Sequence, residues 1–256
     1  MLFDTHAHYD DSRFDDDRDA LLSSMPAHNV GLILNPGCDV ETSRKAISYA
    51  QKYPFVYAAT GIHPENINEN WNNELLVIYE LAREEPRVRA IGEIGLDYFW
   101  EKDERARARQ QVVFDRQMKL ARELGKPVIV HDRDAHADCL EITRRYPEVT
   151  GVYHCFAGSV EMARELLELG YYLSFTGVIT FKNARRAIEV IRMAPIERLM
   201  IETDAPYMAP EPYRGRRNSS IYVHRMAEAI AQIKGMDVEE VERITTENGK
   251  RLFAIF

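Results

Sequence analysis

The sequence predicts an α/β protein of the (β/α)8 or TIM-barrel class. Two observations carry this prediction: short apolar runs alternate with longer helical patterns eight times, and the 256 residues match the roughly 250 that such a barrel typically contains. A doubly wound open sheet remains the alternative, because periodicity alone does not show whether a sheet closes on itself. No low-complexity run or Gly/Ser-rich linker divides the chain, so residues 1–256 are predicted to form one domain.

The predicted strands are short apolar runs, several of them rich in β-branched residues. The first begins at Leu2, and the other seven cover residues 30–34, 55–60, 88–91, 127–130, 151–153, 171–174 and 199–201. Helical patterns follow the strands in turn, at residues 16–27, 40–51, 73–84, 104–124, 135–146, 160–169 and 184–193, and the chain closes with helices 222–234 and 238–253. The longest helix is predicted to stop at Gly125-Lys126-Pro127, a regular helix-end signal.

Composition limits the classes of function. The net charge of −8 argues against a protein that coats long duplex nucleic acid, since such binding rests on many lysine and arginine contacts to phosphate, but it leaves room for an enzyme that grips one strand end. No stretch reaches the roughly 18 apolar residues of a membrane helix, and no secretory leader is recognisable. Cys38, Cys139 and Cys155 lack Cys-x-x-Cys spacing, which predicts reduced thiols. We therefore expect a cytoplasmic enzyme with no membrane contact and no obligate protein partner.

Two histidines follow the opening apolar run, in the stretch Asp4-Thr5-His6-Ala7-His8. Alternate residues of an extended chain point the same way, so His6 and His8 can aim their imidazoles at one point just past the strand. Imidazole is a common ligand for zinc and other divalent ions. Two surface histidines in a loop would look the same, so the metal interpretation depends on further ligands at the ends of later strands.

Residues able to bind metal do follow the later strands, and in a barrel these strand ends line the face where chemistry is carried out. They are Asn35, His63, Glu93, His131, His154, Glu202 and Asp204. Five of the eight histidines fall at strand ends, which a random scatter would not give. The other three, His28, His136 and His224, are predicted to be exposed or satisfied within helices.

These segments together resemble the TatD family of metal-dependent deoxyribonucleases, within the amidohydrolase-like barrels. The resemblance covers essentially the whole chain and rests on a series of motifs: Asp4-Thr5-His6-Ala7-His8, Gly61-Ile62-His63-Pro64, Gly92-Glu93-Ile94-Gly95-Leu96-Asp97-Tyr98, His131-Asp132-Arg133-Asp134-Ala135, His154-Cys155-Phe156-Ala157-Gly158-Ser159 and Glu202-Thr203-Asp204-Ala205-Pro206-Tyr207. It implies a two-metal site in which Glu93 bridges the ions. The implied ligands are His6, His8, Glu93 and Asp204 for one ion, and Glu93, His131 and His154 for the other. One departure is Glu65, which stands where a histidine is common.

The chemistry of such a site suits hydrolysis of a phosphodiester, because one ion can activate a water while the other stabilises the departing oxygen. Asp204 is expected to bind metal through one oxygen and to act as general base with the other. Glu202 is expected to support a ligand histidine, and His63 to contact a phosphate oxygen or protonate the leaving group. Magnesium or manganese is expected in function, whereas zinc would bind tightly to a histidine-rich site.

Substrate contacts are predicted from the stretch after the eighth strand, Pro212-Tyr213-Arg214-Gly215-Arg216-Arg217-Asn218. Its arginines, Arg214, Arg216 and Arg217, can pair with phosphates through planar two-point contacts, although charge runs are usually solvated loops. Asn218 and Arg133 are predicted as further substrate contacts. Tyr98, Phe99 and Trp100 follow Glu93 and are suited either to stacking a terminal base or to capping the core.

The sequence therefore predicts a 3′–5′ exonuclease that trims single-stranded DNA from its end. The alternative is an amide or ester hydrolase of the same barrel class, acting for example on an aminoacyl-tRNA ester or a cyclic amide, with nearly the same ligands. The arginine-rich stretch favours the nuclease, since a small neutral substrate would not require it. A metal-binding scaffold without turnover fits poorly with six ligands and a candidate base.

Overall fold

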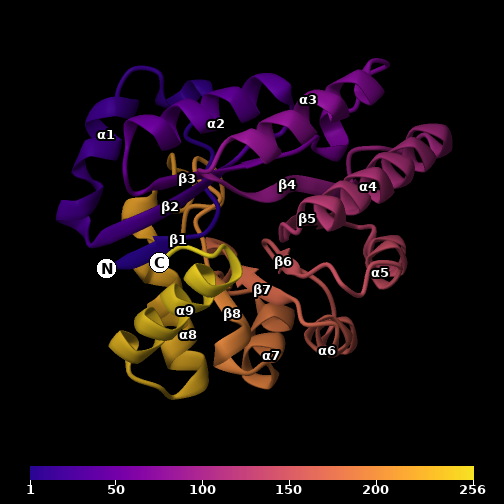
Figure 1. Ribbon diagram of the computed structural model, residues 1–256. Helices are drawn as coiled ribbons and strands as arrows, with labels where there is room; N and C mark the ends of the chain where they lie inside the picture. The colour runs from indigo at the N-terminus through magenta and orange to yellow at the C-terminus, as the bar shows by residue number, and fades with distance from the viewer.

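The computed structural model describes all residues, 1–256, and its strands form one parallel sheet in the order β1 to β8. The sheet curls into a nearly closed barrel with helices between successive strands (Figure 1), which confirms the predicted (β/α)8 class. Just past the strands, the backbone N–H of Thr5 donates to the Ile201 carbonyl at 3.3 Å, and Ala7 forms a parallel bridge with Ala205. These contacts join the first strand to the last.

The strands agree closely with the predicted runs. They are β1 (Leu2–Asp4), β2 (Val30–Pro36), β3 (Val56–Thr60), β4 (Val88–Asp97), β5 (Val128–Arg133), β6 (Gly151–Tyr153), β7 (Tyr172–Phe175) and β8 (Leu199–Ile201). The helices are α1 (Arg18–Ser24), α2 (Val40–Lys52), α3 (Trp71–Glu84), α4 (Glu104–Leu124), α5 (His136–Arg144), α6 (Val160–Glu168), α7 (Arg185–Met193), α8 (His224–Lys234) and α9 (Val238–Leu252). Short 3-10 turns, including η2 (Met25–His28) and η3 (Pro64–Asn66), complete the connections.

Strands β4 and β5 extend past their predicted ends, and this places the site. β4 and β5 shift register between Ile91 and Ile94 and then continue to pair, from Gly95 with His131 to Asp97 with Arg133. Glu93 therefore lies within β4, and His131 lies within β5. The first helix is shorter than predicted, since α1 gives way to η2 at Pro26, whose ring removes a backbone N–H from the helix.

One buried side chain from each strand fills the inside of the barrel. These residues are Phe3, Leu34, Ala59, Ala90, Ile129, Val152, Tyr172 and Met200. Leu252, Phe253 and Ile255 from the end of the chain join the same cluster, and the ring centroids of Phe3 and Phe253 are 6.0 Å apart. The last residues of the chain thus close the barrel interior.

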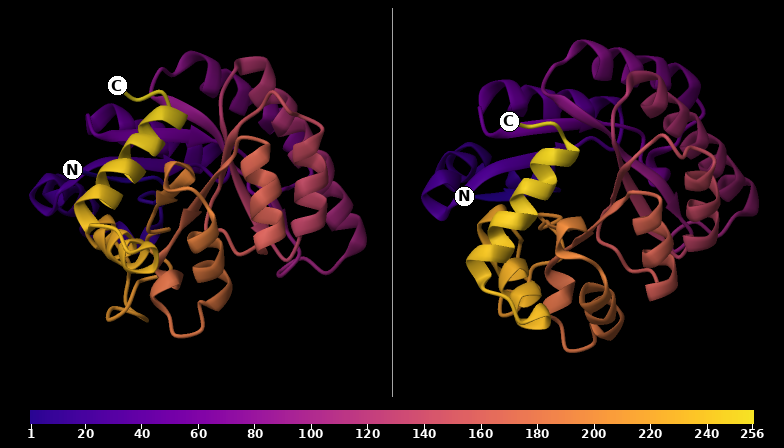
Figure 2. Two further views of the ribbon diagram at one scale, coloured as in Figure 1. Left: turned by 90° about the horizontal axis from the view of Figure 1, so that it is seen from below. Right: turned by 60° about the horizontal axis from the view of Figure 1, so that its bottom comes forward.

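A second apolar cluster, of 56 buried residues, lies mainly between the sheet and the ring of helices seen in Figure 2. Helix ends are fixed locally: Asp39 and Thr42 form a capping box at the start of α2, and Gly125 ends α4 in the left-handed conformation, as predicted. No helix of the structure combines the length and apolar character needed to cross a bilayer.

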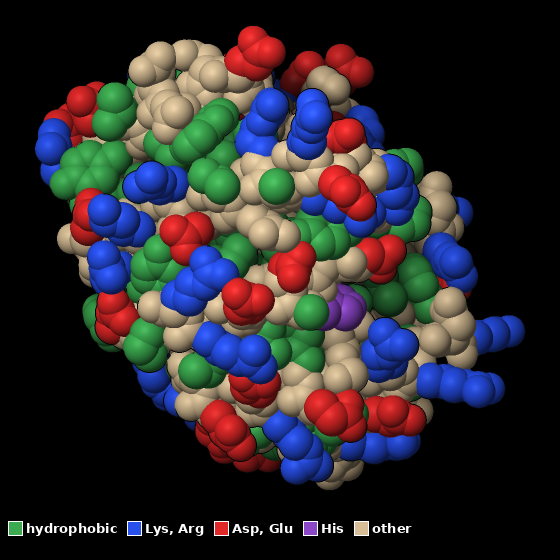
Figure 3. All heavy atoms as spheres, turned by 90° about the vertical axis from the view of Figure 1, so that its right-hand side faces the viewer, with side chains coloured by type: hydrophobic (Ala, Val, Ile, Leu, Met, Phe, Trp, Pro, Cys, Tyr) green, Lys and Arg blue, Asp and Glu red, His purple; other side chains and the backbone are tan.

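Acidic and basic side chains are interspersed on the face that carries α4 and α5 (Figure 3). This mixture follows from a composition of 33 lysine and arginine residues against 41 aspartate and glutamate residues. An outer surface with both signs of charge does not favour wrapping by a long polyanion.

Candidate metal centre

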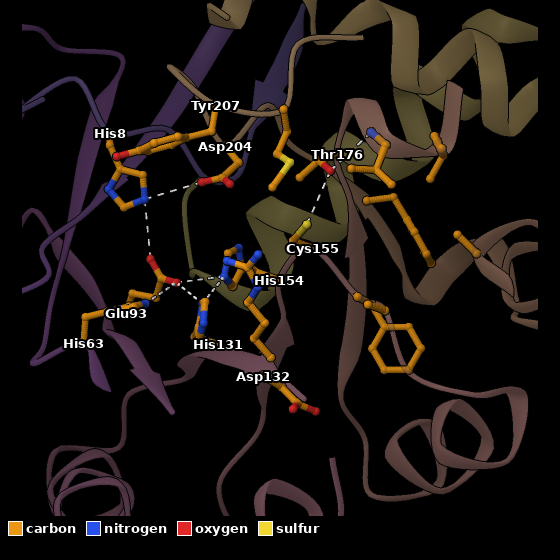
Figure 4. Close-up of a pocket in the computed structure, with 18 of the residues that line it drawn as sticks. His8, His63, Glu93, His131, Asp132, His154, Cys155, Thr176, Asp204 and Tyr207 are labelled. Carbon is orange, nitrogen blue, oxygen red and sulfur yellow. Dashed lines mark hydrogen bonds and ion pairs between the residues drawn. The ribbon is translucent and has the colours of Figure 1, made fainter. Parts of the chain in front are cut away.

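The residues predicted as metal ligands converge at the carboxyl ends of the strands, and Figure 4 labels all of them except His6. They come from segments far apart in the chain: the turn after β1, strands β4 and β5, and the residues just after β6 and β8. They are His6, His8, Glu93, His131, His154 and Asp204. Parallel strands direct their carboxyl ends to one face of a barrel, which explains how sequence-distant residues meet.

The two carboxylate oxygens of Glu93 face two different groups of histidines. Oε2 lies 3.2 Å from His6 Nε2 and 3.4 Å from His8 Nε2. Oε1 lies 2.8 Å from both His131 Nδ1 and His154 Nε2. Figure 4 shows Glu93 between His8 on one side and His131 with His154 on the other. Glu93 is therefore placed as a carboxylate shared by two ligand groups.

Asp204 completes the first group. Its Oδ1 lies 3.5 Å from His8 Nε2 and 3.8 Å from His6 Nε2. The residue has a φ of 55°, a left-handed conformation that aspartate tolerates better than most residues. Its backbone N–H donates to the His6 carbonyl at 2.9 Å. The turns after β1 and β8 are thereby held together with their ligand side chains facing one point.

The donor set fits divalent metal. Ligands about 2.1 Å from one ion in a tetrahedral arrangement lie about 3.4 Å from one another, close to the separations around Glu93. His6 Nε2 and His8 Nε2 are 3.0 Å apart, and both face Glu93 Oε2. A cation between them would satisfy both. The groups His6, His8 and Glu93, and His63, Glu93 and His131, each have the spacing of a metal site.

Electrostatics keeps the shared carboxylate ionised. Burial alone would raise the pKa of Glu93, but its interactions with the neighbouring imidazoles of His154, His63 and His6 hold that pKa well below its usual range. Asp204 follows the same pattern, since the effect of its burial is outweighed by the hydrogen bond from His8 and the charge of His6, which lower its pKa. Ionised carboxylates are the form that binds metal.

Two buried carboxylates face the histidines that were predicted as ligands. Glu202 Oε1 lies 3.4 Å from His154 Nδ1 and accepts a hydrogen bond from the Cys155 N–H at 2.6 Å, so it sits where a supporting role requires. Asp97 Oδ2 lies 3.1 Å from His131 Nε2. Sequence reasoning gave Asp97 no role, although the signal was present: it follows Glu93 by four residues, and alternate residues of a strand share a face.

Asp4 was also missed. Its carboxylate accepts hydrogen bonds from the Thr203 N–H at 2.9 Å, the Thr203 hydroxyl at 2.6 Å and the Ser220 hydroxyl at 2.5 Å. Burial raises the pKa of Asp4 to about 7. Asp4 thus fastens β1 to the turn that carries Asp204. Its position two residues before His6, on the same side of an extended chain, was the available signal.

His63 is close to the second group without joining it as tightly. Its Nε2 lies 3.4 Å from Glu93 Oε1, while its Nδ1 accepts a hydrogen bond from the Glu65 N–H at 3.2 Å. With Nδ1 as the acceptor, the neutral ring carries its proton on Nε2. His63 therefore presents a donor toward the centre of the site.

The centre forms part of the wall of a cavity of about 1120 Å³. Arg133 lines it, as do Arg185 and Arg186 at the start of α7, which the sequence did not single out because they follow no strand directly. The apolar part of the wall includes Phe156, Phe175, Val178, Ile179, Ala184 and Ala187. The cavity can hold a ligand much larger than a single amide or ester group.

The arginine-rich stretch lies elsewhere. Arg214, Arg216 and Arg217 are not among the residues that line the cavity. Arg217 forms an ion pair with Asp17 at 2.5 Å, and the guanidinium of Arg214 lies 4.3 Å from the Phe181 ring centroid. The stretch is therefore not part of the cavity wall.

Asn218 requires a correction. Its side chain is fully buried, and its Nδ2 group donates to the Thr203 carbonyl at 2.8 Å and the Tyr207 carbonyl at 2.7 Å. Both amide hydrogens are thereby used, so the predicted substrate contact is wrong. The residue instead braces the turn around Asp204, because a buried amide is most stable where backbone groups satisfy it.

The barrel and its cluster of histidines and carboxylates are those of a metal-dependent hydrolase. A family model described as TatD related DNase matches residues 3–254, and the chain belongs to this family. An uncharacterized metal-dependent hydrolase of Bacillus subtilis, YabD, is 44% identical, with 100% of both chains covered. A protein of Cronobacter sakazakii named 3′-5′ ssDNA/RNA exonuclease TatD is 35% identical over 98% of this chain and 97% of its own. The crystal structure of YjjV, a TatD homologue from Escherichia coli, superposes with a TM-score of 0.92 at 31% identity, covering 100% of this chain and 98% of that one.

Proposed function

We propose that this hydrolase cleaves phosphodiester bonds of DNA and removes nucleotides from single strands in the 3′–5′ direction, using two divalent ions. The observation that carries the proposal is that the two carboxylate oxygens of Glu93 face different pairs of histidines. Its Oε2 faces His6 and His8, and its Oε1 faces His131 and His154. A shared carboxylate is what two like-charged ions held about 3.5 to 4 Å apart require. The name of the Cronobacter relative supports a nucleic-acid substrate.

Two groups of residues would hold the ions. The first is His6, His8, Glu93 and Asp204; the second is Glu93, His131 and His154. When bound, the two ions supply activation of water and neutralisation of charge on the leaving oxygen. Magnesium or manganese is proposed in function, and zinc is proposed to bind tightly to the histidines.

Two side chains of the protein are proposed to carry out the proton transfers, one as acceptor and one as donor. Asp204 Oδ1 faces His8, and its second oxygen is proposed to accept a proton from the attacking water. His63 is proposed to donate from Nε2 to a phosphate oxygen or to the leaving group. Arg133, on the cavity wall, is proposed to pair with a phosphate. The three free cysteines support a location in the reducing cytoplasm.

The test is degradation of end-labelled single-stranded DNA by metal-stripped protein that is then supplied with magnesium, manganese or zinc. We expect a ladder that shortens from the 3′ end and is absent in Asp204→Asn. The matched control is Asp16→Asn, which makes the same substitution at an exposed position outside the cavity and should behave as wild type.

The same protein preparations distinguish the nuclease from the alternative, an amide or ester hydrolase. If the wild-type protein leaves DNA intact with every ion but hydrolyses an aminoacyl-tRNA ester or a cyclic amide, the nuclease proposal fails and the amide or ester hydrolase replaces it. The size of the cavity, about 1120 Å³, favours a DNA strand over a small cyclic amide.

A further inference from the structure

Two aromatic side chains are exposed in the loop that follows β4. Trp100 is 62% exposed and Phe99 is 40% exposed, and their ring centroids lie 4.8 Å apart at 85°. A large aromatic surface left in water is unfavourable unless a ligand or partner covers it. Because most of Trp100 is exposed, part of its ring is open to stacking by a ligand.

Trp100 stands between two cavities. It lines the cavity of about 1120 Å³ that contains the metal centre, and it also lines a smaller cavity of about 250 Å³. The apolar residues Pro64, Ile67 and Ala106 line the smaller cavity with it. A chain that leaves the metal centre in this direction must therefore cross the Trp100 ring.

Arg133 adds a positive charge beside the aromatic pair. Its guanidinium carbon lies 4.0 Å from the Phe99 ring centroid and 5.5 Å from that of Trp100. It forms no ion pair, and it lines the larger cavity. An arginine oriented by aromatic rings and without a carboxylate partner is ready to bind a phosphate.

The loop is tied to the metal centre. The backbone N–H of Trp100 donates to Asp97 Oδ1 at 2.8 Å, and the other oxygen of Asp97 faces His131 at 3.1 Å. Arg107 donates to the Tyr98 carbonyl at 3.0 Å and to the Glu101 carbonyl at 2.9 Å. The aromatic pair is thus held at a fixed position relative to the proposed ligands.

We propose that Trp100 is a stacking platform for one nucleobase of the single strand next to the scissile phosphate, with Arg133 on the adjoining phosphate. This inference rests on the proposed function and deepens it. A flat ring beside an unpaired cation matches one nucleotide, which offers a flat base and an anion. The smaller cavity is lined by two carboxylates, those of Glu65 and Glu101, and by one cation, Arg109, so its net charge disfavours a phosphate. The base therefore enters there, and the backbone stays on the Arg133 side.

Fluorescence tests the stacking directly, because the chain has only two tryptophans, Trp71 and Trp100. In Trp71→Phe the signal comes from Trp100 alone. A hydrolysis-resistant phosphorothioate oligothymidylate is expected to quench it, whereas an abasic oligomer with the same linkages is not. Equal quenching by both oligomers, or none when anisotropy shows the oligothymidylate bound, would overturn the platform.

Steady-state kinetics provide a second test of the stacking proposal. Trp100→Ala is expected to lower kcat/KM for oligothymidylate roughly 5- to 150-fold, the range that corresponds to one stacked base, while Trp100→Phe keeps most of the activity. Hydrolysis of methyl p-nitrophenyl phosphate, a diester without a nucleobase, should be unchanged in both. The control is Leu76→Ala, which removes an exposed apolar side chain from α3, outside both cavities.

The outcomes separate the two proposals. If the wild-type protein cleaves the small diester but no oligonucleotide, the nuclease function fails and the platform fails with it. If oligothymidylate is cleaved and Trp100→Ala equals wild type, only the platform is overturned. Equal losses on both substrates would also overturn it, because Trp100→Ala would then impair the metal centre itself rather than the stacking of a base.

Discussion

The two oxygens of Glu93 face separate groups of histidines, and the buried acids around the site hold that arrangement. Asp97, Glu202 and Asp4 each contact a ligand histidine or the turn that carries Asp204. Such partners fix the ring orientation and the tautomer of a ligand histidine. At this scale the site depends on residues that do not touch the substrate.

Asp97→Asn is expected to weaken metal binding about 10- to 100-fold, the usual effect of losing a carboxylate behind a ligand histidine. Titration of metal-stripped protein by calorimetry checks the affinity. The matched control is Asp103→Asn, since asparagine caps a helix as well as the aspartate at the start of α4 does. An unchanged affinity in Asp97→Asn would remove Asp97 from the account of the site.

At the scale of elements, β5 and α5 are joined by an ion pair between Asp132 and His136, with His136 Nδ1 at 2.8 Å from Asp132 Oδ2. The pair lies at the strand end that carries His131. The hydrogen bond to Asp132 raises the pKa of His136. A histidine with a raised pKa stabilises the fold fully below its unfolded pKa of about 6.5, and this stabilisation is lost as the pH rises through the folded pKa.

His136→Gln keeps a hydrogen-bond donor but removes the charge. We expect it to lower the free energy of unfolding by up to about 1 kcal/mol at pH 5.5, since the histidine is partly exposed, and by less at pH 9. Urea unfolding of metal-stripped protein at the two pH values measures the difference. His28→Gln, at an exposed position, is the control. A difference that grows with pH would contradict the assignment.

The residues at the end of α9 and just after it fill the barrel interior. Phe253 is buried against Phe3, and Phe253→Ala is expected to cost about 3 to 5 kcal/mol of unfolding free energy by leaving a cavity. Phe256→Ala, three residues later at a fully exposed position, should change it by less than about 0.5 kcal/mol. Denaturant unfolding of both variants tests this, and similar losses in the two would show that the chain's end does not close the barrel.

For the whole molecule, metal binding would couple the two ends of the sheet. The ligand groups join the segments after β1 and β8 with β4 and β5. Any ion that binds only the folded state stabilises it, by about 2.7 kcal/mol at 100 times the dissociation constant. We expect metal-stripped protein to unfold at a lower temperature and metal to restore it. Glu93→Gln should show a smaller shift, and a shift equal to wild type would place the ions elsewhere.

Much of the architecture could be predicted from the sequence. Strand β6 (Gly151–Tyr153) and helix α4 (Glu104–Leu124) occur where predicted, because apolar periodicity and helix-end signals are local properties. The ligand histidines could be found for a related reason: in a barrel, residues after strands share one face. Long β4 could not be predicted, because its pairing with β5 continues across a register shift that involves both strands.

The sequence by itself determined the alternation and order of the strands and helices and the residues available to bind metal, since each of these follows from local pattern and strand direction. Only the tertiary structure decided which way side chains point and which partners they meet. Arg217 pairs with Asp17, Asn218 turns inward to brace the Asp204 turn, and Trp100 turns outward between two cavities. Their neighbours in space come from distant parts of the chain, and the interaction free energies that orient them exist only once the barrel has closed.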